Sequence, residues 1–346
     1  MARKQRLMEL DILRVWAILL IVLAHVPGYA PDLEIGRFAI YLVTAGLSIF
    51  MFVSGYALRL SNDRLAGLGD VVAFVRKRLL RIYPLYALAL LLFVVLFQYV
   101  GIYHRIDFAP VPWNALIHLF GLQGLLAPRI EPLFTLWFIG VLMLYYAAYG
   151  VIAACGLTTS RIVATSLLLL CLFAGLRYFA GVIDNRFFLY YPVFIAGILA
   201  GQVGLARPSG AMWALMAAAA VAAVCSGAAL WPVRDLVYDD KGLLAGRSLE
   251  GEALRLVFSL STAVGALWLS RAWARRMSPT CGKAVLALSV ASYAAYLYHR
   301  IILAMLASFM NRVLDVRGGA SRQRGYSWWV SRSSSLSRIF CSTVRF

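Results

Sequence analysis

An arginine and a histidine stand out in the first apolar stretch of the chain, because ionisable side chains are costly inside a membrane. Arg14 and His25 are eleven residues apart. Eleven helical steps of about 100° place both on one face, about 16 Å apart along the axis. Histidine suits general-base work near neutral pH and also acts as a nucleophile. The pair predicts a catalytic stripe; the alternative is a histidine that only bonds a neighbouring helix.

A second cluster of basic residues lies in the segment from Phe74 to Pro84, FVRKRLLRIYP. Arg78 and Arg81 are three residues apart and so are neighbours on a helix face. Two guanidinium groups suit phosphates, such as those of coenzyme A. Basic residues that flank a membrane span also act as topology signals or contact lipid headgroups, and this alternative stays open.

The last apolar stretch carries a third polar set. Ser292, Tyr296 and His299 follow i, i+4, i+7 spacing and form one stripe on a helix. Such a stripe can bind the acceptor substrate or hold helices together. A second histidine inside the membrane favours a functional site.

Nothing in the sequence indicates a metal site or a disulfide. The five cysteines are scattered, without a CxxC motif or metal-ligand spacing. We interpret them as small buried apolar residues.

The elements that position these residues must be membrane helices. The 346 residues are 62% hydrophobic and only 14% charged, whereas soluble chains are about half apolar and about a quarter charged. Stretches of about 17–25 apolar residues predict spanning helices. The sequence predicts an all-α, polytopic membrane protein in a lipid bilayer, with nine spans near residues 10–27, 38–60, 82–101, 133–155, 162–182, 187–206, 211–231, 253–270 and 284–310.

The charges of the loops predict the orientation. Basic clusters at the N-terminus, at residues 76–81 and at residues 271–283 should be cytoplasmic. This requires that the short stretch Trp113–Leu126 is re-entrant or interfacial rather than spanning. The basic start and the apolar run Val15–Ala24 resemble a signal peptide, but Asp11 and Arg14 interrupt the start of this helix. We therefore expect a multi-pass protein of a bacterial inner membrane with a cytoplasmic N-terminus.

The net charge of +18 does not predict nucleic-acid binding, because the basic residues lie in short clusters between apolar segments. The predicted domain covers residues 1–310. Residues 311–346 form a Ser/Arg-rich tail with seven arginines and one aspartate. With nine spans this tail would lie outside, against the charge rule. Either it is disordered, or a final tenth helix has been lost, for instance by a change of reading frame.

Together these segments resemble acyltransferase family 3, the membrane acyltransferases, over roughly residues 8–310. The landmarks occur in the family's order: Glu9 to Arg14 with His25, the segment Phe52–Tyr56, Arg78 to Pro84, Leu136-Trp-Phe, and Ser292 to His299. This resemblance implies transfer of an acyl group, usually acetyl, from cytoplasmic acyl-CoA to an extracytoplasmic sugar or polysaccharide hydroxyl, with no metal.

The resemblance also implies roles for individual residues. His25 would be catalytic with Arg14 as its motif partner, Arg78 and Arg81 would bind the CoA donor, and Tyr296 and His299 would contact the acceptor. The family's Ser-Leu-x-x-Glu element is replaced by the residues after Leu133, so only Glu131 or Thr135 could substitute for its glutamate. The competing hypothesis is a transporter or flippase of a lipid-linked glycan. The oligomeric state and the identity of the sugar are not predicted.

Overall fold

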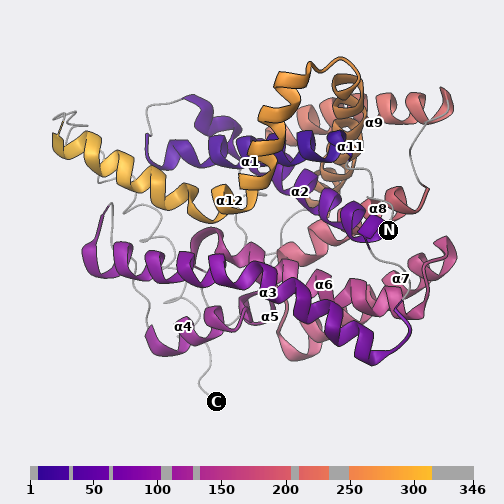
Figure 1. Ribbon diagram of the computed structural model, residues 1–346, viewed down its shortest axis with the longest axis horizontal. Helices are drawn as coiled ribbons and strands as arrows, with labels where there is room; N and C mark the ends of the chain where they lie inside the picture. Colours follow the sequence, from indigo (N-terminus) through magenta and orange to yellow (C-terminus); the bar gives the residue numbers. More distant parts are fainter. Residues whose placement is uncertain are drawn as a thin grey trace.

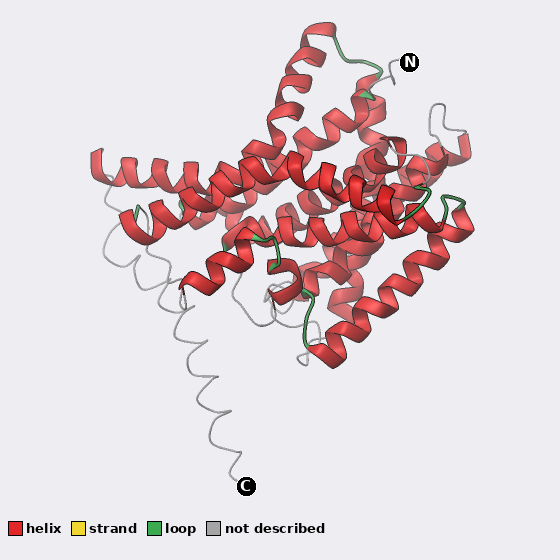
Figure 2. Cartoon of the chain, turned by 60° about the horizontal axis from the view of Figure 1, so that its bottom comes forward, coloured by secondary structure: helices red, strands yellow, loops and turns green. Residues whose placement is uncertain are grey.

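The computed structural model of the chain describes residues 7–30, 34–61, 65–102, 111–127, 133–203, 210–233 and 249–313. These residues form helices and short connections, and no strand occurs among them (Figure 2). Nine helices in the described ranges are long and apolar enough to cross a membrane. The predicted all-α polytopic fold is thereby confirmed, and the described residues supply nine candidate spans.

The helices are labelled in Figure 1. They are α1 (Met8–His25), α2 (Ala39–Ser61), α3 (Leu68–Phe93), α4 (Val111–Leu119), α5 (Gln123–Leu126), α6 (Trp137–Cys155), α7 (Thr159–Gly175), α8 (Asn185–Val203), α9 (Gly210–Leu230), α11 (Leu249–Ala274) and α12 (Pro279–Val313). A π-helical turn, Val94–Val100, extends α3, and another, Leu176–Ala180, extends α7. Single 3-10 turns cover Val26–Gly28, Glu34–Phe38, Phe134–Leu136 and Trp231–Val233.

One boundary differs from the predicted spans. The third span begins at Leu68, fourteen residues before the predicted start, so Arg78 and Arg81 lie inside α3 rather than ahead of it. The helix continues through Pro84, which removes one backbone donor without ending it. The stretch from Trp113 to Leu126 forms the two short helices α4 and α5, which are too short to cross a bilayer, as predicted.

We name the two sides of the bundle by residues of α1. The Arg14 side is where α1 begins, and the His25 side is where it ends. In Figure 1 the N-terminus and the start of α3 lie toward the right, on the Arg14 side. The ends of α3 and α12, together with α4, lie toward the left, on the His25 side.

The helix α1 is enclosed by α2, α11 and α12, and α2 packs along α8. Glycines allow these close approaches. A Cβ atom at Gly55 of α2 would collide with the carbonyl oxygen of Phe194 in α8, and one at Gly197 of α8 would collide with that of Phe52 in α2. The two backbones therefore touch where small residues face each other.

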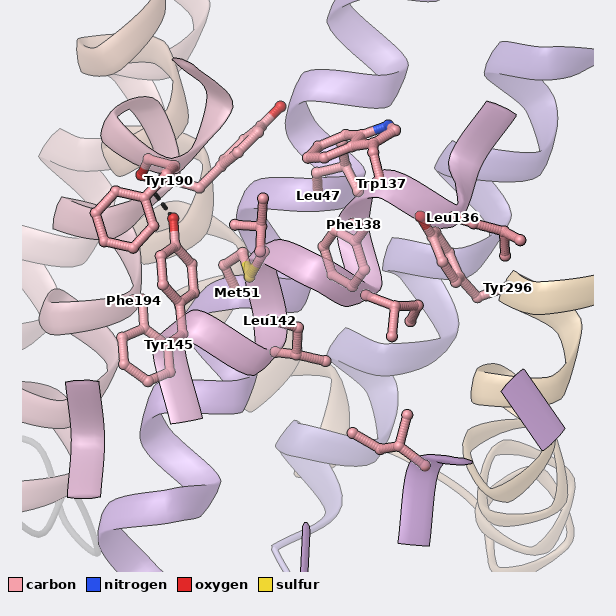
Figure 3. Close-up of a cluster of buried hydrophobic side chains, with 14 of the residues drawn as sticks. Leu47, Met51, Leu136, Trp137, Phe138, Leu142, Tyr145, Tyr190, Phe194 and Tyr296 are labelled. Carbon is pink, nitrogen blue, oxygen red and sulfur yellow. Dashed lines mark hydrogen bonds between the residues drawn. The ribbon is translucent and has the colours of Figure 1, made fainter. Parts of the chain in front are cut away.

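The largest core cluster gathers around α6, most of whose aromatic side chains are buried (Figure 3). Tyr145 donates a hydrogen bond of 2.7 Å to the carbonyl oxygen of Phe187 and stacks on Phe194. Phe138 packs against Tyr296 of α12 with ring centroids 4.9 Å apart. This cluster fixes the helix that carries Tyr296 against the centre of the bundle.

The helices α7 and α9 lie at the periphery. In the apolar stretches that could cross the membrane, only 11% of the residues around α7 and 17% of those of α9 are buried inside the protein. Leu168 and Val224, for example, are 71% and 74% exposed. Apolar side chains at such exposure require lipid as their solvent.

Candidate active site

His25 and His299 lie side by side although they come from the first and last described helices. Their ring centroids are 4.9 Å apart, with an angle of 58° between the ring planes. His299 is only 4% exposed, and His25 is half-buried. The structure thus brings together two residues that the sequence assigned to separate stripes.

Both rings are held in the same tautomer by the backbone of their own helices. Nδ1 of His25 is 2.7 Å from the carbonyl oxygen of Ile21, and Nδ1 of His299 is 2.7 Å from that of Tyr296. Because a carbonyl oxygen can only accept, Nδ1 is the donor in both bonds. The lone pair of each neutral ring is therefore on Nε2. Nε2 of His299 is buried and has no hydrogen-bond partner within the described ranges.

The end of α1 explains the exposure of His25. Pro27 follows two residues later, and proline has no backbone N–H to continue a helix. The chain turns at Val26–Gly28, and His25 is the last α-helical residue of α1. Its ring therefore lies at the very end of α1, on the His25 side.

Tyr296 stands between this histidine pair and the aromatic core. Its ring centroid is 5.9 Å from that of His299, and the side chain is 1% exposed. Its hydroxyl donates a bond of 2.6 Å to the carbonyl oxygen of Thr135. The hydroxyl hydrogen of Tyr296 is thus used in a hydrogen bond to the backbone, and its ring packs against the ring of His299.

Thr135 is one of the two positions considered as substitutes for the family's glutamate. It is 5% exposed, and its Oγ1 is buried without a hydrogen-bond partner in the described part of the chain. The other position, Glu131, lies outside the described residues. The structure thus places Thr135 beside Tyr296, whose hydroxyl donates to its carbonyl oxygen.

Arg14 lies near the opposite end of α1 and pairs with a carboxylate. Its Nη1 is 3.0 Å from Oδ1 of Asp11, one turn earlier in the helix. The same oxygen accepts a hydrogen bond of 2.6 Å from the hydroxyl of Ser289 in α12. Asp11 is 1% exposed, whereas the side chain of Arg14 keeps 30% of its surface accessible. The guanidinium is thus paired with a buried carboxylate, while part of the Arg14 side chain stays accessible.

The arginines of α3 come to the same region. Arg78 is half-buried with its guanidinium 5.4 Å from the centre of the Phe74 ring, and Arg81 is exposed. The hydroxyl of Tyr146, in α6, lies within electrostatic range of Arg78, Arg81 and Arg14. All three predicted arginines therefore lie within electrostatic range of one tyrosine.

The short helices on the His25 side are held by a buried polar network. Nδ1 of His118 donates to the carbonyl oxygen of Asn114 at 2.8 Å, and Nε2 accepts from the backbone N–H of Leu133 at 2.9 Å. Gln123 donates to the hydroxyl of Tyr86 at 3.0 Å and to the carbonyl oxygen of Leu136 at 2.9 Å. Burial lowers the pKa of His118, so the ring is kept neutral. This histidine is structural.

Three contacts of the site were missed from the sequence. Asp11 could have been found from its spacing of three residues to Arg14, which is a neighbour distance on a helix. Arg300 follows His299 directly and lies within electrostatic range of both imidazoles. Ser289 had no local signal, because its partner Asp11 is 278 residues away. Within the described residues, no three His, Cys, Asp or Glu side chains gather as metal ligands.

Comparison with known proteins supplies the family. A family model described as an acyltransferase domain matches residues 8–341. The match extends beyond residue 310, where the motif resemblance ended, and covers residues outside those that the structure describes. No curated protein and no solved structure matches the chain. The chain therefore belongs to acyltransferase family 3 and is a multi-pass membrane acyltransferase.

Proposed function

We propose that the protein transfers an acetyl group from cytoplasmic acetyl-CoA to a hydroxyl of an extracytoplasmic sugar or polysaccharide, in a bacterial inner membrane. The observation that carries the proposal is that two different groups of side chains lie at the two ends of α1. Arg14 and the arginines of α3 gather at one end, and the histidine pair lies at the other. A donor that carries phosphates and an acceptor that carries hydroxyls would be served by these two ends respectively.

The Arg14 side fits the donor. Three guanidinium groups around Tyr146 provide forked donors that match phosphate oxygens. They lie on the side that the basic loops predict to be cytoplasmic, where acyl-CoA is made available. The arginines would hold the phosphate-bearing part of the donor, and its acyl thioester would extend along the α1 face toward His25.

The His25 side fits the acceptor. Nε2 of His25 would take the proton from the acceptor hydroxyl as the hydroxyl oxygen attacks the thioester carbonyl. The C–O ester bond forms, the C–S bond breaks, and the leaving thiolate receives the proton from His25. The Nδ1 bond to Ile21 keeps Nε2 basic and correctly oriented. Nε2 of His299 would accept a hydrogen bond from a neighbouring hydroxyl of the acceptor sugar, with Tyr296 as its support.

The test uses purified protein in proteoliposomes with radiolabelled acetyl-CoA outside, on the Arg14 side, and an oligosaccharide acceptor inside. We expect label in the acceptor with wild-type protein and at least about 100-fold slower labelling with His25→Ala. Wild-type transfer by His25→Ala would overturn the role of this histidine. Label that stays on the protein after quenching, and is lost in His25→Ala, would replace the general-base step with a covalent acyl-histidine step.

A further inference from the structure

We infer that Asp11 is a positioning residue that holds Arg14 in its donor-binding orientation, and that Ser289 of α12 in turn holds Asp11. This inference rests on the proposed function, because it assigns Arg14 to the acyl-CoA side. It adds two residues to the machinery of the site. Neither of them is expected to touch the reacting atoms.

The burial of Asp11 is the first argument. A carboxylate that is 1% exposed inside a membrane helix must be paired and hydrogen-bonded, since isolated burial of its charge is very costly. Oδ1 receives both the Nη1 bond of Arg14 at 3.0 Å and the hydroxyl bond of Ser289 at 2.6 Å. The two contacts converge on one oxygen atom, so a change at Ser289 reaches Arg14 through Asp11.

The difference in exposure between the partners is the second argument. Asp11 and Ser289 are 1% and 5% exposed, but the side chain of Arg14 is 30% exposed. Burying both members of an ion pair costs desolvation energy that their attraction need not repay, so the burial of only one member calls for an explanation. Here the anion is sealed and the cation faces accessible space, as expected for a guanidinium that is oriented by a fixed partner and offered to a ligand.

The helix that supplies Ser289 is the third argument. Ser289 lies in α12, ten residues before His299, and Asp11 lies in α1, fourteen residues before His25. The two helices that meet at the histidine pair thus also meet at Asp11 and Ser289. Figure 1 shows α12 changing direction along its length, and these two contacts tie it to α1 at separate points. The serine therefore links the donor end of the site to the helix that carries the acceptor residues.

The other acidic residue of the first turn serves as a contrast. Oε1 of Glu9 lies 3.7 Å from Nε of Arg271 in α11, too far for a hydrogen bond. This pair connects α1 to α11 and does not include Arg14. It contacts α11 from the side of α1 that carries Glu9, whereas Arg14 pairs with Asp11 within α1.

The experiment measures binding of acetyl-CoA by isothermal titration calorimetry, in a His25→Ala background that cannot turn over. Asp11→Asn keeps the shape of the side chain and an acceptor for Ser289 but removes the charge that orients Arg14. We expect it to weaken binding by about tenfold or more, as for loss of a charged hydrogen bond. Ser289→Ala should weaken binding by a smaller factor, and Ser289→Thr should restore it. Ser226→Ala is the matched control, because the hydroxyl of Ser226 is buried and bonds only to carbonyl oxygens of its own helix.

A merely structural role of Asp11 and Ser289 predicts another pattern. The variants would lower Tm in detergent but would bind acetyl-CoA as the parent does, and that result would overturn the inference. In the active background we expect the donor KM to rise in Asp11→Asn while kcat changes little. If the protein with native Asp11 and Ser289 binds no acetyl-CoA, the proposed donor is wrong and the inference falls with it. If binding responds to Asp11 but His25→Ala still transfers, only the catalytic assignment fails.

Discussion

The imidazole of His299 packs against that of His25 at a centroid distance of 4.9 Å, and each ring donates its Nδ1 hydrogen to a carbonyl oxygen of its own helix. Two basic Nε2 atoms are thereby kept in one small region of the bundle. One belongs to a half-buried ring and the other is sealed. This asymmetry suggests different tasks for the two histidines, and it can be tested by changing them singly and together.

Substitution of His25 by alanine should lower kcat for acyl transfer by at least about 100-fold, because a positioned general base contributes that much or more. The donor KM should change little, since the arginines that serve the donor lie at the other end of α1. The measurement is transfer of labelled acetyl groups at varied acetyl-CoA concentration. A normal kcat with a raised donor KM would assign His25 to binding instead.

Substitution of His299 by alanine should also lower kcat, and the effect should not add to that of His25→Ala. Residues that act as one unit give double variants no worse than the more damaging single variant. The three proteins are compared for kcat and for Tm, because removal of a buried ring also leaves a cavity. Fully additive losses in activity would show that the two histidines act independently.

Replacement of Arg78 by lysine should raise the donor KM although the charge is kept. A lysine ammonium is a point charge and cannot give the forked contact that a guanidinium gives to a phosphate. We expect a change of about tenfold in KM, as for one charged hydrogen bond, and a larger one when Arg81→Ala is added. The control is Arg161→Ala, an exposed arginine at the start of α7, on the Arg14 side. An equal rise in KM with the control would indicate a general effect of surface charge.

The spans could be predicted from the sequence because their signals are local. An apolar run reports one helix, and loop charge reports its direction, so nine spans and a non-spanning Trp113–Leu126 followed without knowledge of packing. The start of α3 could not be predicted in this way. Its first turns are mixed in polarity, and the helix there is held by packing of Phe74 against Tyr149.

The sequence could predict the polar stripe of each helix, but not how the stripes of different helices combine into one site. Spacing places Arg14 and His25 on one face, and Tyr296 and His299 on another, but it gives no information on which faces meet. The pairing of His25 with His299, and of Asp11 with Ser289, depends on how α1 crosses α12. The roles given to these residues stay predictions until the variants are measured.

The stability of the protein should fall below about pH 6.5, the ordinary pKa of histidine, in part because of His118. Burial lowers the pKa of His118 in the folded state, so the unfolded chain binds the proton more readily. Stability from this residue is therefore complete above the unfolded pKa and declines as the pH falls below it. Protonation would also abolish the acceptor that Nε2 offers to the N–H of Leu133.

The measurement for His118 is Tm in detergent between pH 5 and pH 8, for wild type and for His118→Gln. Glutamine does not titrate, so the variant should have a lower Tm at pH 8 and a weaker dependence on pH. Identical pH dependence in both proteins would assign the titration to other histidines, such as His25 and His299.

Enlargement of Gly197 to alanine should destabilise the bundle by separating α2 from α8. Its new methyl group would meet the carbonyl oxygen of Phe52, part of a backbone that cannot move aside as a flexible side chain can. Overpacking of this kind costs about 1–3 kcal/mol. The expected result is a lower Tm, together with reduced transfer activity, because Phe52 belongs to the helix that packs directly on α1.

Gly175→Ala is the matched control, since no atom lies within 4 Å of a methyl group at that position in α7. Alanine favours a helix over glycine, so the control should keep or raise Tm. An unchanged Tm in Gly197→Ala would mean that the contact between α2 and α8 is looser than its geometry requires.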